Sequence, residues 1–205
     1  MRTKLMVDSA PRRLVVGITG ASGAILGVRV LDACRELGVE THLVVSRAAA
    51  LTLAHETPFS LPELLSKATT THKVGDVGAA IASGSFPTLG MIVAPCSVRT
   101  MSEIATGVTS SLLTRAADVV LKERRTLVLM VRETPLHLGH LRTMTQLAEM
   151  GAVIAPPVPA FYAKPASLEE MVDQSVGRAL DLFGLAWGPV RRWGDDLAAI
   201  EGDES

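Results

Sequence analysis

The stretch Leu14-Val-Val-Gly-Ile-Thr-Gly-Ala-Ser-Gly-Ala24 reads as a buried strand that runs into a turn of small residues and then opens a helix. Gly17, Gly20 and Gly23 leave out the Cβ atom where backbone must bend sharply or approach a ligand. The N–H groups at the helix start favour a phosphate or another electron-rich group, and Ser22 adds a hydroxyl. The spacing G-x-x-G-x-x-G differs from the G-x-G-x-x-G dinucleotide fingerprint. The motif therefore predicts either a nucleotide or flavin site of unspecified kind or a tight turn without a ligand.

Apolar runs alternate with amphipathic stretches along the rest of the chain. Buried strands are predicted at 14–18, 40–45, 90–94, 126–131 and 151–155. Helical spacing of apolar residues predicts helices at 25–37, 47–55, 101–122, 138–150 and 168–183. Weaker signals over 57–87 predict a short helix and an exposed loop. This alternation indicates an α/β protein with a three-layer Rossmann-like or flavodoxin-like doubly wound parallel sheet.

Composition favours one domain in the cytoplasm. The chain has 205 residues, of which 48% are hydrophobic, so we expect a single domain at 13–193 with flexible ends at 1–12 and 194–205. A formal net charge of −1 offers no field for nucleic acid or an anionic membrane, and no apolar run approaches the roughly 20 residues that span a bilayer. Residues 1–13 lack the pattern of a secretory signal.

Cysteine and histidine positions give no sign of a metal site. Cys34 falls in a predicted helix and reads as a core residue, while Cys96 follows a strand and is either reactive or packed. The five histidines lack a consistent spacing with acids or cysteines. We therefore expect no bound metal.

Ligands of parallel sheets bind beyond the carboxyl ends of the strands, so the residues after each strand are the first candidates. The second strand ends at Ser46, where an enzyme that recognises an unphosphorylated dinucleotide ribose would usually carry Asp or Glu. The Ser46 hydroxyl suits a phosphate, a helix N-cap, or both. Arg47 would suit the 2′-phosphate of an NADP-type cofactor, which leaves a dinucleotide reductase as an alternative.

Two further strand ends carry polar groups. Ala94-Pro-Cys-Ser-Val-Arg-Thr100 offers the hydroxyls of Ser97 and Thr100 beside a helix start, which suits either an anion or an ordinary cap. The fourth strand finishes with Arg132-Glu133-Thr-Pro135, which places a planar cation and a carboxylate at the same edge. We expect Arg132 to emerge where the other loops converge, because charges beside buried strands usually have partners.

Six ordered motifs connect these strand ends with the rest of the chain. They are Gly-Ile-Thr-Gly-Ala-Ser-Gly-Ala at 17–24, Ser46, Ala-Pro-Cys-Ser-x-x-Thr at 94–100, Arg-Ala-Ala-Asp-Val-x-Leu-Lys-Glu-Arg-Arg at 115–125, Arg-Glu-x-Pro at 132–135 and Pro-Ala-Phe-Tyr at 159–162. Together they resemble the flavin prenyltransferase family over about 13–193. The chain carries Ser110, Ser111 and Thr143 where that family often has Asn. The resemblance implies a homo-oligomer that binds FMN and dimethylallyl monophosphate, uses no metal, and makes prenylated FMN for a partner decarboxylase.

The resemblance also implies which residues hold the two ligands. FMN is expected to contact Gly20, Ala21, Ser22, Ser46, Ser97, Val98, Arg99, Thr100 and Arg132. Dimethylallyl phosphate is expected to contact Lys122, Arg132, Tyr162 and Arg178. The implied reaction joins a dimethylallyl group to N5 and C6 of reduced FMN, closes a fourth ring and releases phosphate.

Cationic side chains are expected to stabilise the departing phosphate, because the chain has no Asp-rich cluster for magnesium. The candidate cations are Lys122, Arg132 and Arg178. We assign the proton transfers to Glu56 and Glu133, with Ser22 orienting N5. Besides the reductase, two alternatives stay open: an FMN-dependent cysteine decarboxylase-like enzyme and a flavin-binding, non-catalytic subunit of a decarboxylase complex.

Overall fold

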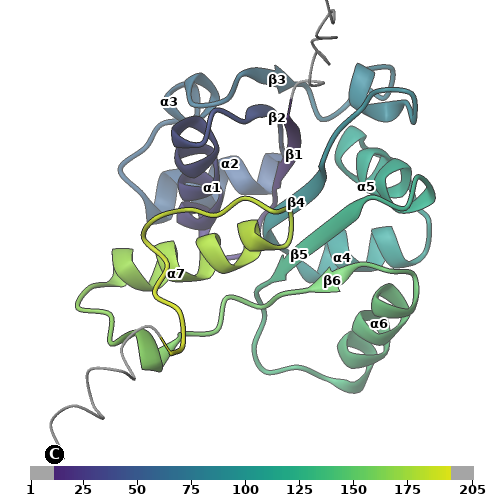
Figure 1. The fold of residues 1–205 in the computed structure, drawn as a ribbon. Helices are drawn as coiled ribbons and strands as arrows, with labels where there is room; N and C mark the ends of the chain where they lie inside the picture. The colour runs from purple at the N-terminus through teal and green to yellow at the C-terminus, as the bar shows by residue number, and fades with distance from the viewer. Residues whose placement is uncertain (1–11, 195–205) are drawn as a thin grey trace, which may run out of the picture.

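Six parallel strands form one sheet in the computed structural model, which describes residues 12–194 (Figure 1). The strands are β1 Arg13–Ile18, β2 Glu40–Val45, β3 Thr70–His72, β4 Gly90–Cys96, β5 Thr126–Val131 and β6 Val153–Ile154. Their order is β3-β2-β1-β4-β5-β6, that of the Rossmann-like doubly wound fold, which confirms the predicted fold class. The predicted flexible ends lie, except for Arg12 and Gly194, outside the described residues.

Helices cover both faces of the sheet and complete the three layers. One face packs against α1 Ala24–Glu36, α2 Arg47–Glu56, α3 Leu61–Ser66 and α7 Leu168–Asp181. The other packs against α4 Val98–Ala105, α5 Leu112–Lys122 and α6 Leu138–Glu149. Two short 3-10 helices, η1 Ala80–Ala82 and η2 Phe161–Ala163, lie in the connections.

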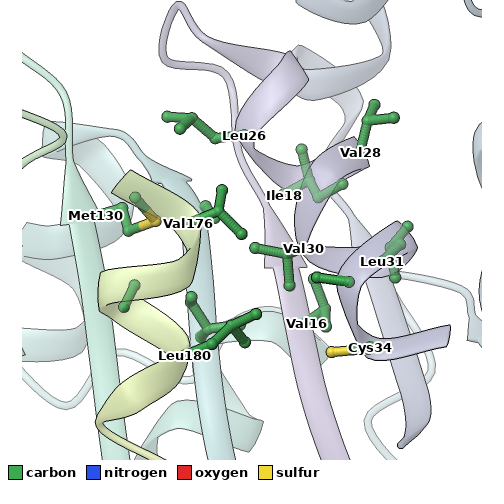
Figure 2. Close-up of a cluster of buried hydrophobic side chains, with 14 of the residues drawn as sticks. Val16, Ile18, Leu26, Val28, Val30, Leu31, Cys34, Met130, Val176 and Leu180 are labelled. Carbon is green, nitrogen blue, oxygen red and sulfur yellow. The ribbon is translucent and has the colours of Figure 1, made fainter. Parts of the chain in front are cut away.

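Alternation of side chains along β1 divides the core into two clusters. Val16 and Ile18 pack with Val30 of α1 and Val176 of α7, as Figure 2 shows. Val15 belongs to the cluster on the opposite face. Each of these side chains is at most 1% exposed, and complete burial of such a side chain contributes about 1.5–3 kcal/mol. Because both faces are buried, the strand reads as an unbroken apolar run.

The prediction of one helix at 101–122 is wrong, because the chain forms two helices there, α4 and α5. Gly107 follows the end of α4 with a φ of 70°, a conformation that a residue with a side chain rarely adopts. Ser111 begins α5, because its hydroxyl accepts a hydrogen bond from the Thr114 N–H while the Thr114 side chain caps in return. The spacing of apolar residues continues through both helices, so this pattern alone did not indicate the break between them.

Three strands also differ from expectation. Strand β3 is only Thr-Thr-His, too short and polar for a hydrophobic pattern to indicate, yet it pairs in parallel with β2. Strand β6 covers two residues of the predicted 151–155. Strand β4 continues to Cys96, past the predicted end at 94, with an irregular register after Val93.

Candidate functional site

Hydrogen bonds join the loops that follow β1, β2, β4 and β5, at the carboxyl ends of these parallel strands. The buried Thr19 hydroxyl donates to the Pro95 carbonyl at 2.7 Å and accepts from the Ser97 N–H at 2.8 Å. The backbone N–H groups of Ser46 and Arg132 donate to the last carbonyls of β1 and β4, at 3.0 and 3.1 Å. The loops therefore converge as predicted. Thr19, which holds two of them together, was not predicted, although it lies inside the 17–24 motif.

A first pocket, of about 510 Å³, lies between the starts of α2 and α4; we call it the hydroxyl-rich pocket. Its lining comprises Gly20, Ser46, Arg47, Ala48, Val74, Gly75, Ser97, Arg99, Thr100, Glu103, Ser110, Ser111 and Leu113. Ser46 and Ser97 cap their helices by accepting from the N–H groups of Ala49 and Thr100, at 3.1 and 3.3 Å. The N-cap serines of three helices, with Ser111 at the start of α5, thus line one cavity, an arrangement that favours an anion such as phosphate.

A second pocket, of about 460 Å³, opens on the other side of the Gly-rich turn; we call it the Glu56 pocket. Its lining comprises Ser22, Gly23, Ile25, Leu26, Glu56, Arg132, Pro157, Pro159, Leu168, Met171, Val172 and Ser175. Most of these side chains are apolar. The Arg132 guanidinium has no hydrogen bond or ion pair within residues 12–194, although its charge acts on Glu56, so a cation without a hydrogen-bonded partner borders the cavity.

The Glu56 carboxylate already occupies the start of α1. It accepts hydrogen bonds from the N–H groups of Gly23 at 2.7 Å and Ala24 at 3.2 Å. Burial alone would raise the pKa of Glu56, but hydrogen bonds from Ser22 and these N–H groups, with the charge of Arg132, lower the pKa overall. The N–H groups at the end of the Gly-rich turn therefore meet the chain's own Glu56 carboxylate, a contact that the sequence did not predict.

Two glycines of the turn meet different needs. Gly23 has a φ of 101°, which strains any residue with a side chain. A Cβ atom on Gly20 would lie 2.4 Å from the Cβ of Ala48, closer than two carbon atoms pack. The close approach at Gly20 is therefore to α2. The turn is left as a thin wall, with Gly20 lining the hydroxyl-rich pocket and Ser22 lining the Glu56 pocket.

A Pro-rich segment separates the Glu56 pocket from a third cavity. Pro157 and Pro159 line the Glu56 pocket, while the intervening Val158 lines a cavity of about 140 Å³ that also contains Arg178. The Arg178 guanidinium donates to the Asp181 carboxylate at 2.6 Å. Ser175 borders both cavities, so the predicted phosphate ligand Arg178 lies next to the Glu56 pocket but outside its lining.

Tyr162 lies on η2, just beyond the Pro-rich segment, and is 41% exposed. Its hydroxyl lies 3.2 Å from the Gln174 Nε2 atom of α7, and its ring meets that of Trp193 edge-on with centroids 5.7 Å apart. Gln174 had no signal in the sequence, because a buried polar residue inside an amphipathic helix looks like part of the solvated face.

Other predicted residues fall outside the pocket linings. Ala21 lies in the turn between them, and Val98 is the first residue of α4. The exposed Glu133 follows β5 and accepts a hydrogen bond from the N–H of Thr134 at 3.0 Å. Lys122 is the last residue of α5 and pairs with its neighbour Glu123. Because α5 ends just before β5 begins, Lys122 lies at the opposite edge of the sheet, and one chain does not bring it to the other predicted residues.

Neither cysteine has the surroundings of a nucleophile. Both are fully buried, and burial raises the pKa of the Cys34 and Cys96 thiols to about 12. Within the part of the chain that the structure describes, no group of three or more His, Cys, Asp or Glu side chains is placed to hold a metal ion. None of the helices between residues 12 and 194 combines the length and apolar character needed to cross a membrane.

Comparison with known proteins shows close relatives. The family model for flavoproteins matches residues 3–180. Flavin prenyltransferase UbiX of Escherichia coli strain K12 is 61% identical over 175 residues, which cover 85% of this chain and 93% of that protein. The protein of the same name from Thauera aromatica is 56% identical over 181 residues, covering 88% of this chain and 93% of that one.

Solved structures agree with this relationship. The crystal structure of AnUbiX (PadA1) in complex with FMN and dimethylallyl pyrophosphate superimposes with a TM-score of 0.89 at 51% identity, covering 90% of this chain and 98% of that one. A dodecameric FMN-dependent UbiX-like decarboxylase from Escherichia coli O157:H7 gives 0.87 at 49% identity, covering 88% and 98%. The FMN-dependent cysteine decarboxylase TvaF gives 0.62 at 13% identity over 85% of this chain and 99% of that one, which shows a shared fold alone. The chain therefore belongs to the flavin prenyltransferase family of flavoproteins.

Proposed function

We propose that the protein is a flavin prenyltransferase, which transfers a dimethylallyl group from dimethylallyl monophosphate to N5 and C6 of reduced FMN and releases phosphate. One observation carries the proposal: the Gly-rich turn is the shared wall of two pockets, one suited to an anion and one largely apolar. A ligand with a phosphate at one end and a flat ring at the other fits such a pair. The relatives named flavin prenyltransferase support it, as does the relative solved with FMN and dimethylallyl pyrophosphate.

In this proposal the hydroxyl-rich pocket holds the FMN phosphate. Ser46 and Ser97 begin the two helices there, and Arg99 and Thr100 follow in the first turn of α4. The first N–H groups of each helix have no partner inside the helix, so they are available to phosphate oxygens. Gly20, Ala21 and Ser22 then lead from this pocket to the next.

The Glu56 pocket would hold the flavin ring and the dimethylallyl group. Reduced FMN supplies the electron-rich N5 and C6 atoms that form the new bonds to carbon. Glu56 is ionised near neutral pH, because its pKa lies below the ordinary value of 4.5, so its carboxylate has lone pairs to accept a proton. Ser22 shares a hydrogen bond with Glu56, so its hydroxyl is placed to pass a proton from the pocket to that carboxylate.

Cations would stabilise the departing phosphate. Arg132 borders the Glu56 pocket, and its guanidinium has no hydrogen-bonded partner among residues 12–194; charge-assisted bonds to phosphate are about twice as strong as neutral ones. Arg178 and Tyr162 flank the adjoining Pro-rich segment. Lys122 lies at the far edge of the sheet, so we assign it to the site of a neighbouring subunit in the homo-oligomer. Glu133 remains a candidate for proton transfer to the phosphate, because it follows Arg132 at the same edge.

The product, prenylated FMN, would serve a decarboxylase that acts separately, in the cytoplasm. A decisive assay incubates the protein with reduced FMN and dimethylallyl monophosphate without oxygen. We expect inorganic phosphate and a flavin heavier by one five-carbon unit in equal amounts. Tight FMN binding without either product would overturn the proposal in favour of a non-catalytic subunit. Preferential NADPH binding would instead favour a reductase, and decarboxylation of a cysteine peptide would favour a cysteine decarboxylase-like enzyme.

A further inference from the structure

Gln174 is a polar side chain buried in α7, only 4% exposed, and it contacts two other segments. Its Nε2 atom lies 2.8 Å from the Arg191 carbonyl and 3.2 Å from the Tyr162 hydroxyl. Its Oε1 atom lies 2.9 Å from the Arg191 N–H. One amide therefore ties α7 to η2 and to the segment after α7.

These contacts determine which way each hydrogen points. A backbone N–H only donates and a backbone carbonyl only accepts, so the Arg191 backbone requires the carbonyl end of the Gln174 amide on one side and its NH₂ end on the other. The second hydrogen of that NH₂ group then points at Tyr162, whose oxygen accepts it. The Tyr162 hydroxyl proton is consequently left free to be donated elsewhere.

The position of Gln174 connects Tyr162 with Arg178. The two α7 residues are four apart, so they share one face of the helix, and both line the cavity beside the Pro-rich segment. An unprotonated phosphate oxygen accepts hydrogen bonds and has no proton to donate, so Tyr162 serves such an oxygen only if its own proton is available. A second bond, from the Arg191 guanidinium to the Ala163 carbonyl at 2.9 Å, holds η2 in the same place.

We infer that Gln174 is a positioning residue for the transfer: it holds the Tyr162 hydroxyl as a donor aimed at the departing phosphate, on the helix face that carries Arg178. The inference rests on the proposed function, in which Tyr162 and Arg178 bind dimethylallyl phosphate. Gln174 itself does not contact the phosphate. Its effect on the reaction therefore passes through Tyr162.

The test compares Gln174→Met, Tyr162→Phe and the double variant in the full-length oligomer, by product formation at varied dimethylallyl monophosphate. We expect Gln174→Met to lower kcat/KM for this substrate about tenfold and to leave FMN affinity unchanged, because a Tyr162 hydroxyl that is no longer held in place loses its one hydrogen bond to the phosphate. Gln146→Met is the matched control, since the Gln146 amide donates to the Ala105 carbonyl at 2.8 Å from another helix. It should leave kcat/KM unchanged.

The double variant separates positioning from mere support of the fold. If Gln174 acts through Tyr162, the Gln174→Met change has no further effect once Tyr162 is Phe. An undiminished second loss would show that Gln174 matters only through the Arg191 backbone, and would overturn the inference while leaving the proposed function intact. A wild-type protein that forms no prenylated flavin would overturn the proposed function, and the inference with it.

A variant of different chemistry guards against poor folding of Gln174→Met. Gln174→Glu keeps the acceptor for the Arg191 N–H but removes both donors, so the Tyr162 hydroxyl donates to the new carboxylate and is lost to the phosphate. We expect Gln174→Glu to impair turnover more than Gln174→Met does, and only while Tyr162 is present. Because the chain has one tyrosine, a ¹³C label on its hydroxyl-bearing carbon gives a single signal that should shift in both variants. An unmoved signal would contradict the hydrogen bond itself.

Discussion

Replacement of Glu56 by Gln separates the two roles that the structure gives this side chain. Glutamine keeps an oxygen that accepts the N–H groups of Gly23 and Ala24, but it carries no charge and accepts no proton. A carboxylate at a helix N-terminus contributes about 0.3–1 kcal/mol when exposed, and Glu56 is mostly exposed, so we expect a stability loss of at most about 1 kcal/mol. The matching fall in Tm is about 2–4 °C.

Activity should fall far more than stability. General bases typically contribute about 10²–10⁴-fold, so we expect Glu56→Gln to lower turnover at least about 100-fold. A loss of about 1 kcal/mol leaves nearly all molecules folded, so unfolding does not account for such a decrease. The assay follows phosphate release and prenylated flavin at saturating reduced FMN and dimethylallyl monophosphate, with melting curves on the same samples.

Glu63→Gln is the control for this experiment. Glu63 accepts bonds from the Ser60 N–H at 2.7 Å and the Ser60 hydroxyl at 2.6 Å at the start of α3, so its local bonding resembles that of Glu56 away from both pockets. Glu63→Gln should leave turnover unchanged. Turnover of Glu56→Gln within about threefold of wild type would refute the role of Glu56 as proton acceptor.

The free energy of unfolding of Glu56→Gln should also depend on pH differently from that of the wild-type protein. The pKa of Glu56 is lowered in the folded protein, so the unfolded chain binds a proton at this carboxylate more tightly than the folded protein does. Its contribution to stability is therefore complete above its ordinary pKa of 4.5 and is lost as pH falls through the lowered value. Denaturant titrations at pH values above and below 4.5 should show that the free energy of unfolding falls less with acidification for Glu56→Gln than for wild type.

Three further predictions concern the wall between the pockets and the oligomer. Gly20→Ala should weaken FMN binding and lower the free energy of unfolding by about 1–3 kcal/mol, because its Cβ would meet Ala48 at 2.4 Å; unchanged stability in equilibrium unfolding would contradict the close approach, and unchanged FMN titration would contradict the place of Gly20 in the FMN site. Thr19→Val keeps the shape but removes the hydroxyl that joins two loops, so urea unfolding should show a loss of about 1–3 kcal/mol; a loss below 0.5 kcal/mol would count against that role. Lys122→Ala and Arg132→Ala should each be inactive, yet mixed oligomers of the two should regain activity if Lys122 serves a neighbour's site, and no recovery would refute this.

Local patterns were sufficient for the sheet and for the convergence of its loops. Strands such as β1 and β5 are buried on both faces, so their apolar runs identify them without any partner being known. Serines such as Ser46 and Ser97 indicate helix starts, because the hydroxyl of each accepts a hydrogen bond from the N–H three residues later. The same local rules failed at the short polar strand β3, whose stability comes from pairing with β2.

Local sequence patterns did not predict contacts between residues that are far apart in the chain. Glu56 reaches Gly23, 33 positions earlier, because α2 packs beside α1, and no spacing in the sequence indicates that contact. Lys122 and Arg132 are both cations next to strand β5. Lys122 ends the helix that leads into the amino end of β5, whereas Arg132 follows its carboxyl end, so the two side chains lie at opposite ends of the strands. Gln174 looks like a surface residue until η2 and the segment after α7 cover it.

The sequence by itself therefore determined the strand–turn–helix order, the burial of the sheet on both faces and the edge at which ligands meet, because each depends on the periodicity and backbone freedom of neighbouring residues. The tertiary structure alone decided which anion meets the start of α1, which cations share a pocket, and where the Tyr162 proton points. Those outcomes depend on hydrogen bonds and charges between segments far apart in the chain, and only packing of the helices onto the sheet brings them within reach.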